Sequence, residues 1–193
     1  MRRPKVLVFG GSTRTDSLNR KLARTAAETL RKAGAEVTLV DLKDFSMPLY
    51  DGDLEAAQGH PEAARAFRDL LGAHDAIVIA SPEYNGSFPA LVKNTIDWAS
   101  RPAPGERPAQ LFRGKLAALV STSPGPGGGR RGLKHLRELL TMIGVNVIPE
   151  ELTIPGAFEA IDAEGRLLRA EDRDALEKLA AGLISAAERK QAA

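Results

Sequence analysis

A loop rich in hydroxyl side chains follows the first apolar segment of the chain and has the composition of an anion-binding site. Residues 6–9 read VLVF, and residues 10–19 read GGSTRTDSLN. The residues that follow have helical periodicity, so the loop lies where a strand passes into the N-terminus of a helix. Unpaired backbone N–H groups and the helix dipole attract phosphate at such a position. The loop is therefore predicted to bind one terminal phosphate.

The side chains of this loop add groups that recognise an oxyanion. Arg14 brings a full charge and a planar fork of donors. Further donors come from Ser12, Thr13, Thr15, Ser17 and Asn19. An ordinary helix cap by Ser17 or Asp16 is the alternative interpretation. A dinucleotide fingerprint is excluded because Gly10 and Gly11 are adjacent and polar residues follow them, and the Walker sequence G-K-[ST] is absent.

Two further loops of unusual composition follow later apolar segments. Residues 81–89 read SPEYNGSFP, in which two prolines restrict the backbone and Asn85-Gly86 permits positive φ angles. Tyr84 and Phe88 offer aromatic surface to a ligand, although aromatic side chains in such turns also pack into cores. Residues 121–129 read STSPGPGGG. This composition permits close approach of a flat ring to the backbone, and it equally suits a flexible connection.

The elements that must position these loops alternate between strand and helix patterns. Strands are predicted at residues 5–10, 37–40, 76–80, 116–120 and 145–148. Helices are predicted at about residues 18–33, 61–71, 89–98, 133–143 and 171–189. This alternation indicates an α/β fold, a doubly wound parallel sheet with helices on both faces. Because ligands bind beyond the carboxyl ends of such strands, the three loops are expected to meet around one crevice.

Composition favours one domain spanning residues 1–193. Of 193 residues 43% are hydrophobic, which suits a single core. The 27 Lys and Arg residues against 25 Asp and Glu residues leave a formal charge of +2 without a basic stripe, so nucleic acid is not the expected partner. With no transmembrane-length segment and no signal-peptide pattern, we expect a cytoplasmic protein that does not contact membranes.

Several kinds of chemistry are excluded by residue type. The chain has no cysteine, which excludes disulfides, thiol nucleophiles and cysteine-ligated metals. His60, His74 and His135 have no carboxylates at metal-ligand spacing, so no metal site is expected. Asp41 ends the second predicted strand, where a dinucleotide-binding fold places its ribose-binding acid. Without the glycine fingerprint, Asp41 is interpreted as a solvated strand-end residue.

Three motifs, in order, resemble a known family. They are Gly11-Ser12-x-Arg14-x-x-Ser17-x-Asn19, Pro82-Glu83-Tyr84-Asn85-Gly86-Ser87-x-Pro89 and Leu91-x-Lys93-Asn94-x-Ile96-Asp97-Trp98. With this spacing, from about residue 5 to residue 150, the chain resembles the NADPH-dependent FMN reductase family and is especially similar to its bacterial quinone and chromate reductases. The resemblance implies a flavodoxin-like fold with strand order 2-1-3-4-5. Residues after 150 match only loosely, and residues 123–125 depart from the family pattern.

The resemblance also implies roles for individual residues. It assigns the FMN phosphate to the first motif, through Gly11, Ser12, Arg14, Ser17 and Asn19. It assigns the isoalloxazine ring to Pro82, Glu83, Tyr84, Asn85 and Gly86, largely through backbone groups. It assigns the ribityl chain and pyrimidine edge to Ser121, Ser123 and Gly125. The helix at residues 89–98 is implied to contribute to a homodimer interface, within a homodimer or homotetramer, although Ile96 and Trp98 equally suit core packing.

The implied function is that of an FMN-dependent oxidoreductase. NADPH or NADH would pass a hydride to the flavin N5, and the flavin would then reduce a small-molecule acceptor such as a quinone, an azo compound, free flavin or chromate, in ping-pong fashion. No residue is assigned a catalytic role, although Arg101 and Glu83 are candidates for positioning a substrate. The alternatives are a non-catalytic flavodoxin-like electron carrier, for which a charge of +2 is a poor match, and a family member that binds without turnover.

Overall fold

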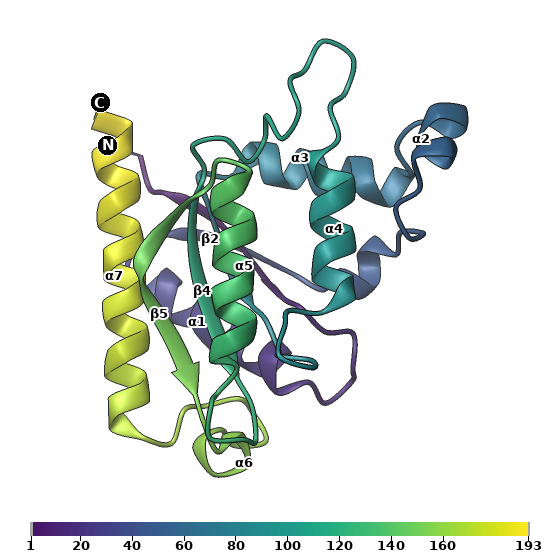
Figure 1. Cartoon of the computed structure of the whole chain (residues 1–193). Coiled ribbons are helices and arrows are strands. Elements are labelled where there is room, and N and C mark those ends of the chain that lie inside the picture. Colours follow the sequence, from purple (N-terminus) through teal and green to yellow (C-terminus); the bar gives the residue numbers. More distant parts are fainter. Residues whose placement is uncertain (1, 193) are drawn as a thin grey trace.

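The computed structural model describes residues 2–192, which contain a five-stranded sheet with helices on both faces (Figure 1). The strands are β1 (Lys5–Gly10), β2 (Glu36–Val40), β3 (Ala76–Ala80), β4 (Leu116–Thr122) and β5 (Asn146–Ile154). Their order across the sheet is β2-β1-β3-β4-β5, and every neighbouring pair is parallel. This order is that of flavodoxin-like doubly wound sheets, so the predicted fold class is confirmed.

The helices cover the two faces of the sheet in separate groups. They are α1 (Leu18–Lys32), η1 (Leu42–Phe45), α2 (Gly52–Gln58), α3 (Glu62–Ala73), α4 (Ala90–Ser100), α5 (Arg130–Met142), α6 (Ala157–Ala160) and α7 (Ala170–Ala192). α1 and α7 pack on one face of the sheet, and α3, α4 and α5 pack on the other. Among residues 2–192, no helix is both long and apolar enough to cross a membrane.

The three central strands, β1, β3 and β4, are largely apolar because both of their faces are buried. Successive residues of a strand point to opposite faces. In β1, Val6 and Val8 pack with the residues of α1 and α7, whereas Leu7 and Phe9 pack with those of α3, α4 and α5. All four side chains are at most 3% exposed. A continuous apolar run is therefore what this sheet requires, in place of the alternating pattern of a sheet with one wet face.

The structure departs from the sequence prediction mainly in the connections. β5 extends to Ile154, beyond the predicted end at residue 148, because a polar stretch that includes Pro149 is tolerated in a strand at the sheet edge. The elements η1, α2 and α6 were not predicted, since they are too short to show helical periodicity. These differences leave the order of the strands unchanged, but the longer β5 and the helix α6 add residues near the carboxyl ends of the strands.

One face of α4 holds the segment that precedes α2. The Asn94 amide accepts a hydrogen bond from Tyr50 N at 2.8 Å and donates one to Pro48 O at 2.9 Å. Trp98 Nε1 donates to the same Pro48 oxygen at 2.8 Å. Trp98 is fully buried and Ile96 is 4% exposed within this one chain. Ile96 and Trp98 are therefore packed in the core of this chain. The motif at residues 91–98 also anchors the segment of Pro48 and Tyr50 to α4.

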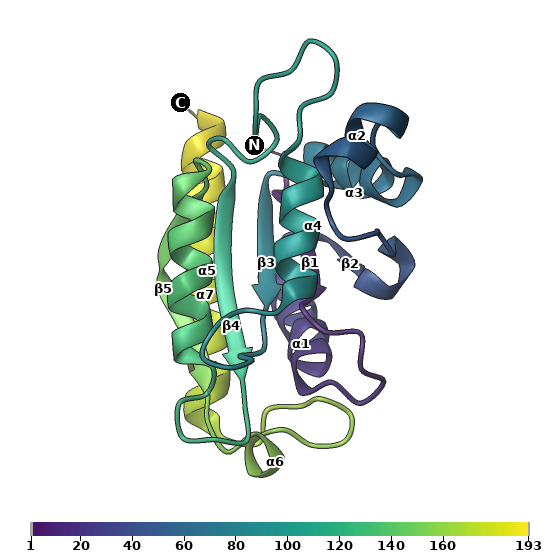
Figure 2. The ribbon, with the colours of Figure 1, turned by 45° about the vertical axis from the view of Figure 1, so that its right-hand side comes forward.

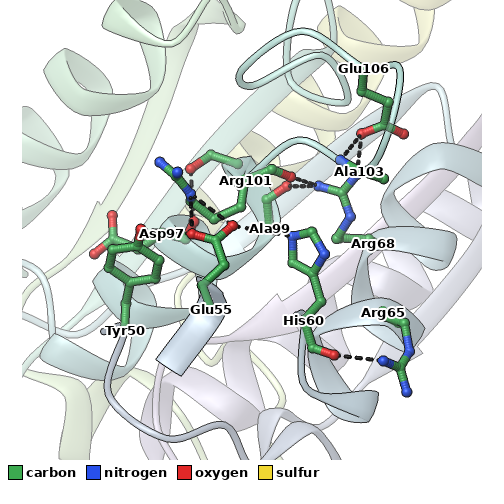
Figure 3. Close-up of polar contacts among 11 residues, drawn as sticks. Tyr50, Glu55, His60, Arg65, Arg68, Asp97, Ala99, Arg101, Ala103 and Glu106 are labelled. Atoms are coloured by element: carbon green, nitrogen blue, oxygen red, sulfur yellow. Dashed lines mark hydrogen bonds and ion pairs between the residues drawn. The ribbon is translucent and has the colours of Figure 1, made fainter. Parts of the chain in front are cut away.

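Arg101 lies at the far end of α4 from the loop of residues 81–89. Its Nε donates to Glu55 Oε2 at 2.9 Å, and its guanidinium lies over the Tyr50 ring (Figure 3). The 11 residues of α4 separate Arg101 from that loop by about 16 Å along the helix axis. Within this chain Arg101 therefore joins α4 to α2, and its role in positioning a substrate stays a prediction.

Arg68 of α3 anchors the long loop that projects beyond α3 and α4 (Figure 1). Its side chain is 7% exposed, donates to Ala99 O at 2.7 Å and pairs with Glu106 (Figure 3). Glu106 also accepts a hydrogen bond from Ala103 N at 3.0 Å. The Ala103 amide, together with the Arg68 guanidinium, holds the pKa of Glu106 below its usual range. The ionised carboxylate is therefore the form that the fold favours.

We expect Glu106→Gln to lower the free energy of unfolding at pH 7 by about 1–3 kcal/mol, because Arg68 loses its charged partner. The ionic contribution is fully present above the glutamate pKa of the unfolded chain and is lost as the pH falls through the lowered pKa of Glu106. Urea unfolding measured from neutral to acidic pH should show the variant and wild type converging in acid.

The matched control is Glu164→Gln, since the Glu164 side chain is 66% exposed in its pair with Arg166. Its effect should stay within about 0.5 kcal/mol. Equal effects of the two variants, or a Glu106→Gln effect that does not change with pH, would contradict this account.

Candidate functional site

A cavity of about 350 Å³ lies at the carboxyl ends of the strands. Residues from the connections after β1, β3 and β4 line it, as expected, and Phe158 and residues 161–163, after β5, line it as well. Figure 2 shows these connections gathered at the lower end of the sheet. None of the lining residues is a histidine or a cysteine. Within residues 2–192, no group of acidic and histidine side chains could hold a metal ion.

Ser12, Arg14 and Ser17 bring hydrogen-bond donors to this cavity. Ser12 and Ser17 are 4% and 5% exposed. Ser17 caps α1, its Oγ accepting from Arg20 N at 3.3 Å, and Ser12 Oγ accepts from Arg14 N at 3.3 Å. Because each hydroxyl accepts in these bonds, each keeps its proton for a ligand. The cap and the anion site are therefore compatible at Ser17.

The N-terminal end of α1 carries positive charge toward the cavity. No acidic residue occupies the first turn of α1, so the helix dipole is not neutralised there. Arg14 and Lys21 line the cavity and form no ion pair within residues 2–192. Asp162 also lines it, but its carboxylate is bound to Arg166 Nε at 2.7 Å, and that contact lowers its pKa. Asp16 and Glu83 also line the cavity, and Glu83 is bound to backbone N–H groups of α5, so Arg14, Lys21 and the helix dipole make the start of α1 favourable for an anion.

Lys21 was not predicted as a site residue. It stands four positions after Ser17 and is thus on the same face of α1. That spacing is the signal through which the sequence could have indicated it.

Arg20 and Asp41 hold the backbone of the first loop without lining the cavity. Arg20 Nη1 donates to Arg14 O at 3.0 Å, and Arg20 Nη2 pairs with Asp41. Asp41 also accepts from Lys43 N at 3.0 Å, which caps η1. The interpretation of Asp41 as a solvated strand-end residue is wrong, because both of its carboxylate oxygens are engaged and its side chain is only 26% exposed.

Asn19 joins the first loop to the end of β4. Its Nδ2 donates to Thr122 O at 2.9 Å, and its Oδ1 accepts from Thr122 N at 3.1 Å. The side chain is 4% exposed and lines the cavity. Its acceptor and one of its two donors are thus used to position the backbone, which leaves a single amide N–H for a ligand.

The loop after β3 presents Pro82, Glu83 and Tyr84 to the cavity. Asn85 and Gly86 have φ angles of 51° and 77°, as the sequence predicted, in a turn closed by paired bonds between Tyr84 and Ser87. Asn85 and Gly86 do not line the cavity. Tyr84 is 47% exposed. The turn therefore directs one aromatic ring toward the site and keeps its two flexible residues outside it.

Glu83 and Gly11 mainly position neighbouring elements. Glu83 Oε2 accepts from Arg131 N at 3.0 Å and Gly132 N at 3.1 Å, so it caps α5. Its carboxylate is thus committed, although the residue lines the cavity. Gly11 does not line the cavity, and a Cβ there would lie 2.6 Å from Val92 Cγ2. A glycine is required for this close approach of the first loop to α4.

The loop after β4 contributes different residues from those predicted. Ser123 lines the cavity, but Ser121 is fully buried away from it. Ser121 Oγ has no hydrogen-bond partner within residues 2–192 and lies where a Cβ on Gly129 would come within 1.8 Å. Gly125 lines an adjoining cavity of about 450 Å³, which shares Glu83 and Ser123 with the first. The glycines of this loop therefore have two roles. Gly129 allows close packing on Ser121, and Gly125 lines the adjoining cavity.

Residues 158–163 are the part of the site that the sequence did not indicate. They follow β5, whose last residues were not predicted as strand. Ala157 N donates to Ser123 O at 3.1 Å, which brings α6 against the loop after β4. Phe158, Ile161 and Asp162 then line the cavity. A helix of four residues carries no periodic signal, so only the three-dimensional structure reveals this wall.

Comparison with known proteins finds one family and relatives that are named as oxidoreductases. Residues 4–159 match the family described as NADPH-dependent FMN reductase. An NAD(P)H-dependent FMN reductase of Pseudomonas aeruginosa is 39% identical over 175 residues, 90% of each chain. A 2-hydroxy-1,4-benzoquinone reductase of a Burkholderia species is 34% identical over 174 residues, again 90% of each chain. Among solved structures, FerB of Paracoccus denitrificans, a flavoenzyme NAD(P)H:(acceptor) oxidoreductase, matches with a TM-score of 0.82 and 30% identity over 96% of this chain and 98% of that one.

We expect Asn19→Ala to lower the free energy of unfolding by about 1–3 kcal/mol, because the buried backbone N–H and C=O of Thr122 lose their partner. Asn146→Ala is the matched control, since that amide is exposed and donates one bond of 3.4 Å to Gly114 O. Urea unfolding of both variants at pH 7 measures the difference. If the two variants lose the same stability, the Asn19 junction does not hold the loops together.

Proposed function

Because the chain belongs to the NADPH-dependent FMN reductase family, we propose that it is an NAD(P)H oxidoreductase that uses FMN to reduce quinones. The observation that carries this proposal is the cavity at the strand ends. One part of its wall combines Arg14, Lys21 and the N-terminal end of α1, and another combines Pro82, Tyr84 and further apolar groups. A phosphate joined to a flat ring system has complementary chemistry.

The residues present fit FMN. Its phosphate would bind the hydroxyls of Ser12 and Ser17, the Arg14 guanidinium and the free N–H groups that begin α1. Lys21 would add a second positive charge. The ring would lie along residues 82–84, and the ribityl chain would pass Thr122 and Ser123. Asn19, Gly11 and Glu83 would act through the loops that they position, and Ser121 would have no direct contact.

When bound, FMN would supply the redox chemistry, a ping-pong transfer of two electrons from NADPH or NADH to the acceptor. The protein supplies binding, orientation and electrostatics. The proposal assigns no side chain as a general acid or base. Arg14 and Lys21 favour negative charge in the cavity, including the phosphate of the cofactor.

The proposal extends to the electron acceptors that the protein reduces, its oligomeric state and its location in the cell. The names of the relatives support quinones as the acceptor class, and azo compounds, free flavin and chromate would accept electrons by the same route. The whole chain would act as one domain in a cytoplasmic homodimer or homotetramer. Leu49, which is 77% exposed on the segment that α4 holds, suits such an interface.

A spectroscopic titration tests the function. Purified protein should take up FMN and turn yellow, bleach on anaerobic addition of NADPH or NADH, and regain its colour when a quinone is added. A colourless protein that takes up no FMN would contradict the proposal. A yellow protein that neither nucleotide bleaches would contradict it as well and would indicate an electron carrier.

We expect Arg14→Ala to raise the dissociation constant of FMN about 10- to 100-fold, because charge-assisted hydrogen bonds to the phosphate are lost. Its free energy of unfolding without FMN should change by no more than about 0.5 kcal/mol, since the side chain is exposed. Fluorescence titration and urea unfolding measure the two quantities. Arg65→Ala, which removes an exposed arginine of α3, is the control that should leave FMN binding unchanged. Parallel losses of binding and stability in Arg14→Ala would show that the arginine is structural.

A further inference from the structure

Phe158 is an exposed aromatic side chain in the wall of the candidate site. It is 76% exposed, although burial of a phenylalanine is strongly favoured. It lines the same cavity as Tyr84 and Pro124. Nothing in the proposed binding of the FMN phosphate or ribityl chain uses this ring. A large apolar side chain in a ligand cavity marks a surface that a ligand covers.

The backbone that carries Phe158 is held firmly. Ala157 and Ala160, on either side of it in α6, are fully buried. Ala157 N donates to Ser123 O at 3.1 Å, and Ala160 O accepts from Leu168 N at 2.9 Å. The first contact ties α6 to the loop after β4, and the second ties it to the segment that precedes α7. The ring of Phe158 is therefore presented from a fixed backbone and does not belong to a free loop.

The position of Phe158 in the fold separates it from the proposed cofactor contacts. The connections after β1, β3 and β4 are neighbours in the sheet, and they carry the groups assigned to FMN. Phe158 comes from the connection after β5, the edge strand on the far side of β4. A cofactor seated on the first three connections leaves this fourth wall for a second molecule.

We infer that Phe158 is a specificity-determining residue that packs against a planar aromatic electron acceptor as it enters the site. Offset or edge-to-face contact with such a ring is favourable, whereas a small inorganic acceptor gains little from it. The quinone takes up a hydride equivalent from anionic reduced FMN and a proton from solvent, and leaves as hydroquinone. Phe158 exchanges no electron or proton in this step. The inference rests on the proposed function.

Steady-state kinetics with two acceptors tests this role. Phe158→Ala should raise the KM for a naphthoquinone about 3- to 10-fold, with kcat changed less than about 2-fold, because only ring contact is lost. The KM for ferricyanide and the dissociation constant of FMN should stay at wild-type values. Phe158→Tyr should retain the wild-type KM for the quinone. Leu168→Ala, which truncates a 54% exposed side chain outside the cavity, is the matched control and should change none of these quantities.

The possible outcomes separate this inference from the proposed function. An unchanged quinone KM in Phe158→Ala, or an equal rise for ferricyanide, would overturn the inference while wild-type activity upheld the function. Weaker FMN binding in Phe158→Ala would also overturn it, since the ring would then contact the cofactor. Wild-type protein that fails to bind FMN or to oxidise NADPH and NADH would instead overturn the proposed function.

Discussion

The pair of hydrogen bonds between the Asn19 amide and the Thr122 backbone is the junction on which the geometry of the site depends. β3 lies between β1 and β4 in the sheet, so this junction passes over the end of β3. It sets the start of α1, and with it the direction of the N–H groups at that end, against the loop after β4. Gly11 allows the same loop to approach α4 closely. The parallel sheet brings the connections to one edge, and these contacts convert that edge into a cavity.

Charge and apolar surface are divided around this cavity. Arg14, Lys21 and the α1 dipole make one part favourable for an anion. Glu83 adds little negative charge toward the ligand, because its carboxylate caps α5. The apolar part is formed by Tyr84 and Phe158, which come from opposite sides of β4 in the order of the sheet. Such a division suits a phosphorylated cofactor with a flat ring and an aromatic second substrate.

The sheet was predictable because its physical requirement is local. A strand segment buried on both faces is apolar at every position, as at residues 6–9 and 76–80. The position of the loop after β1 was predictable for a similar reason, since small hydroxyl residues between a strand and a helix place their donors beside the free N–H groups of that helix, and Ser12 and Ser17 do line the cavity. The partners of individual side chains were not predictable. Asn19 meets a backbone 103 residues away, and Ser121 is buried under Gly129, so neither outcome is encoded by residue type. Likewise, only the positions of α6 and α1 in the fold show that Phe158 and Lys21 line the cavity.

The central claim is that the loop after β1, with the start of α1, binds the phosphate of FMN. Comparing the affinities of the apoprotein for FMN and for riboflavin tests it most directly, because the two ligands differ only in the phosphate. The account predicts that FMN binds at least about 100-fold more tightly, as several charge-assisted hydrogen bonds require, and that the difference narrows as salt is added. Equal affinities for the two ligands, at low and at high salt, would contradict it.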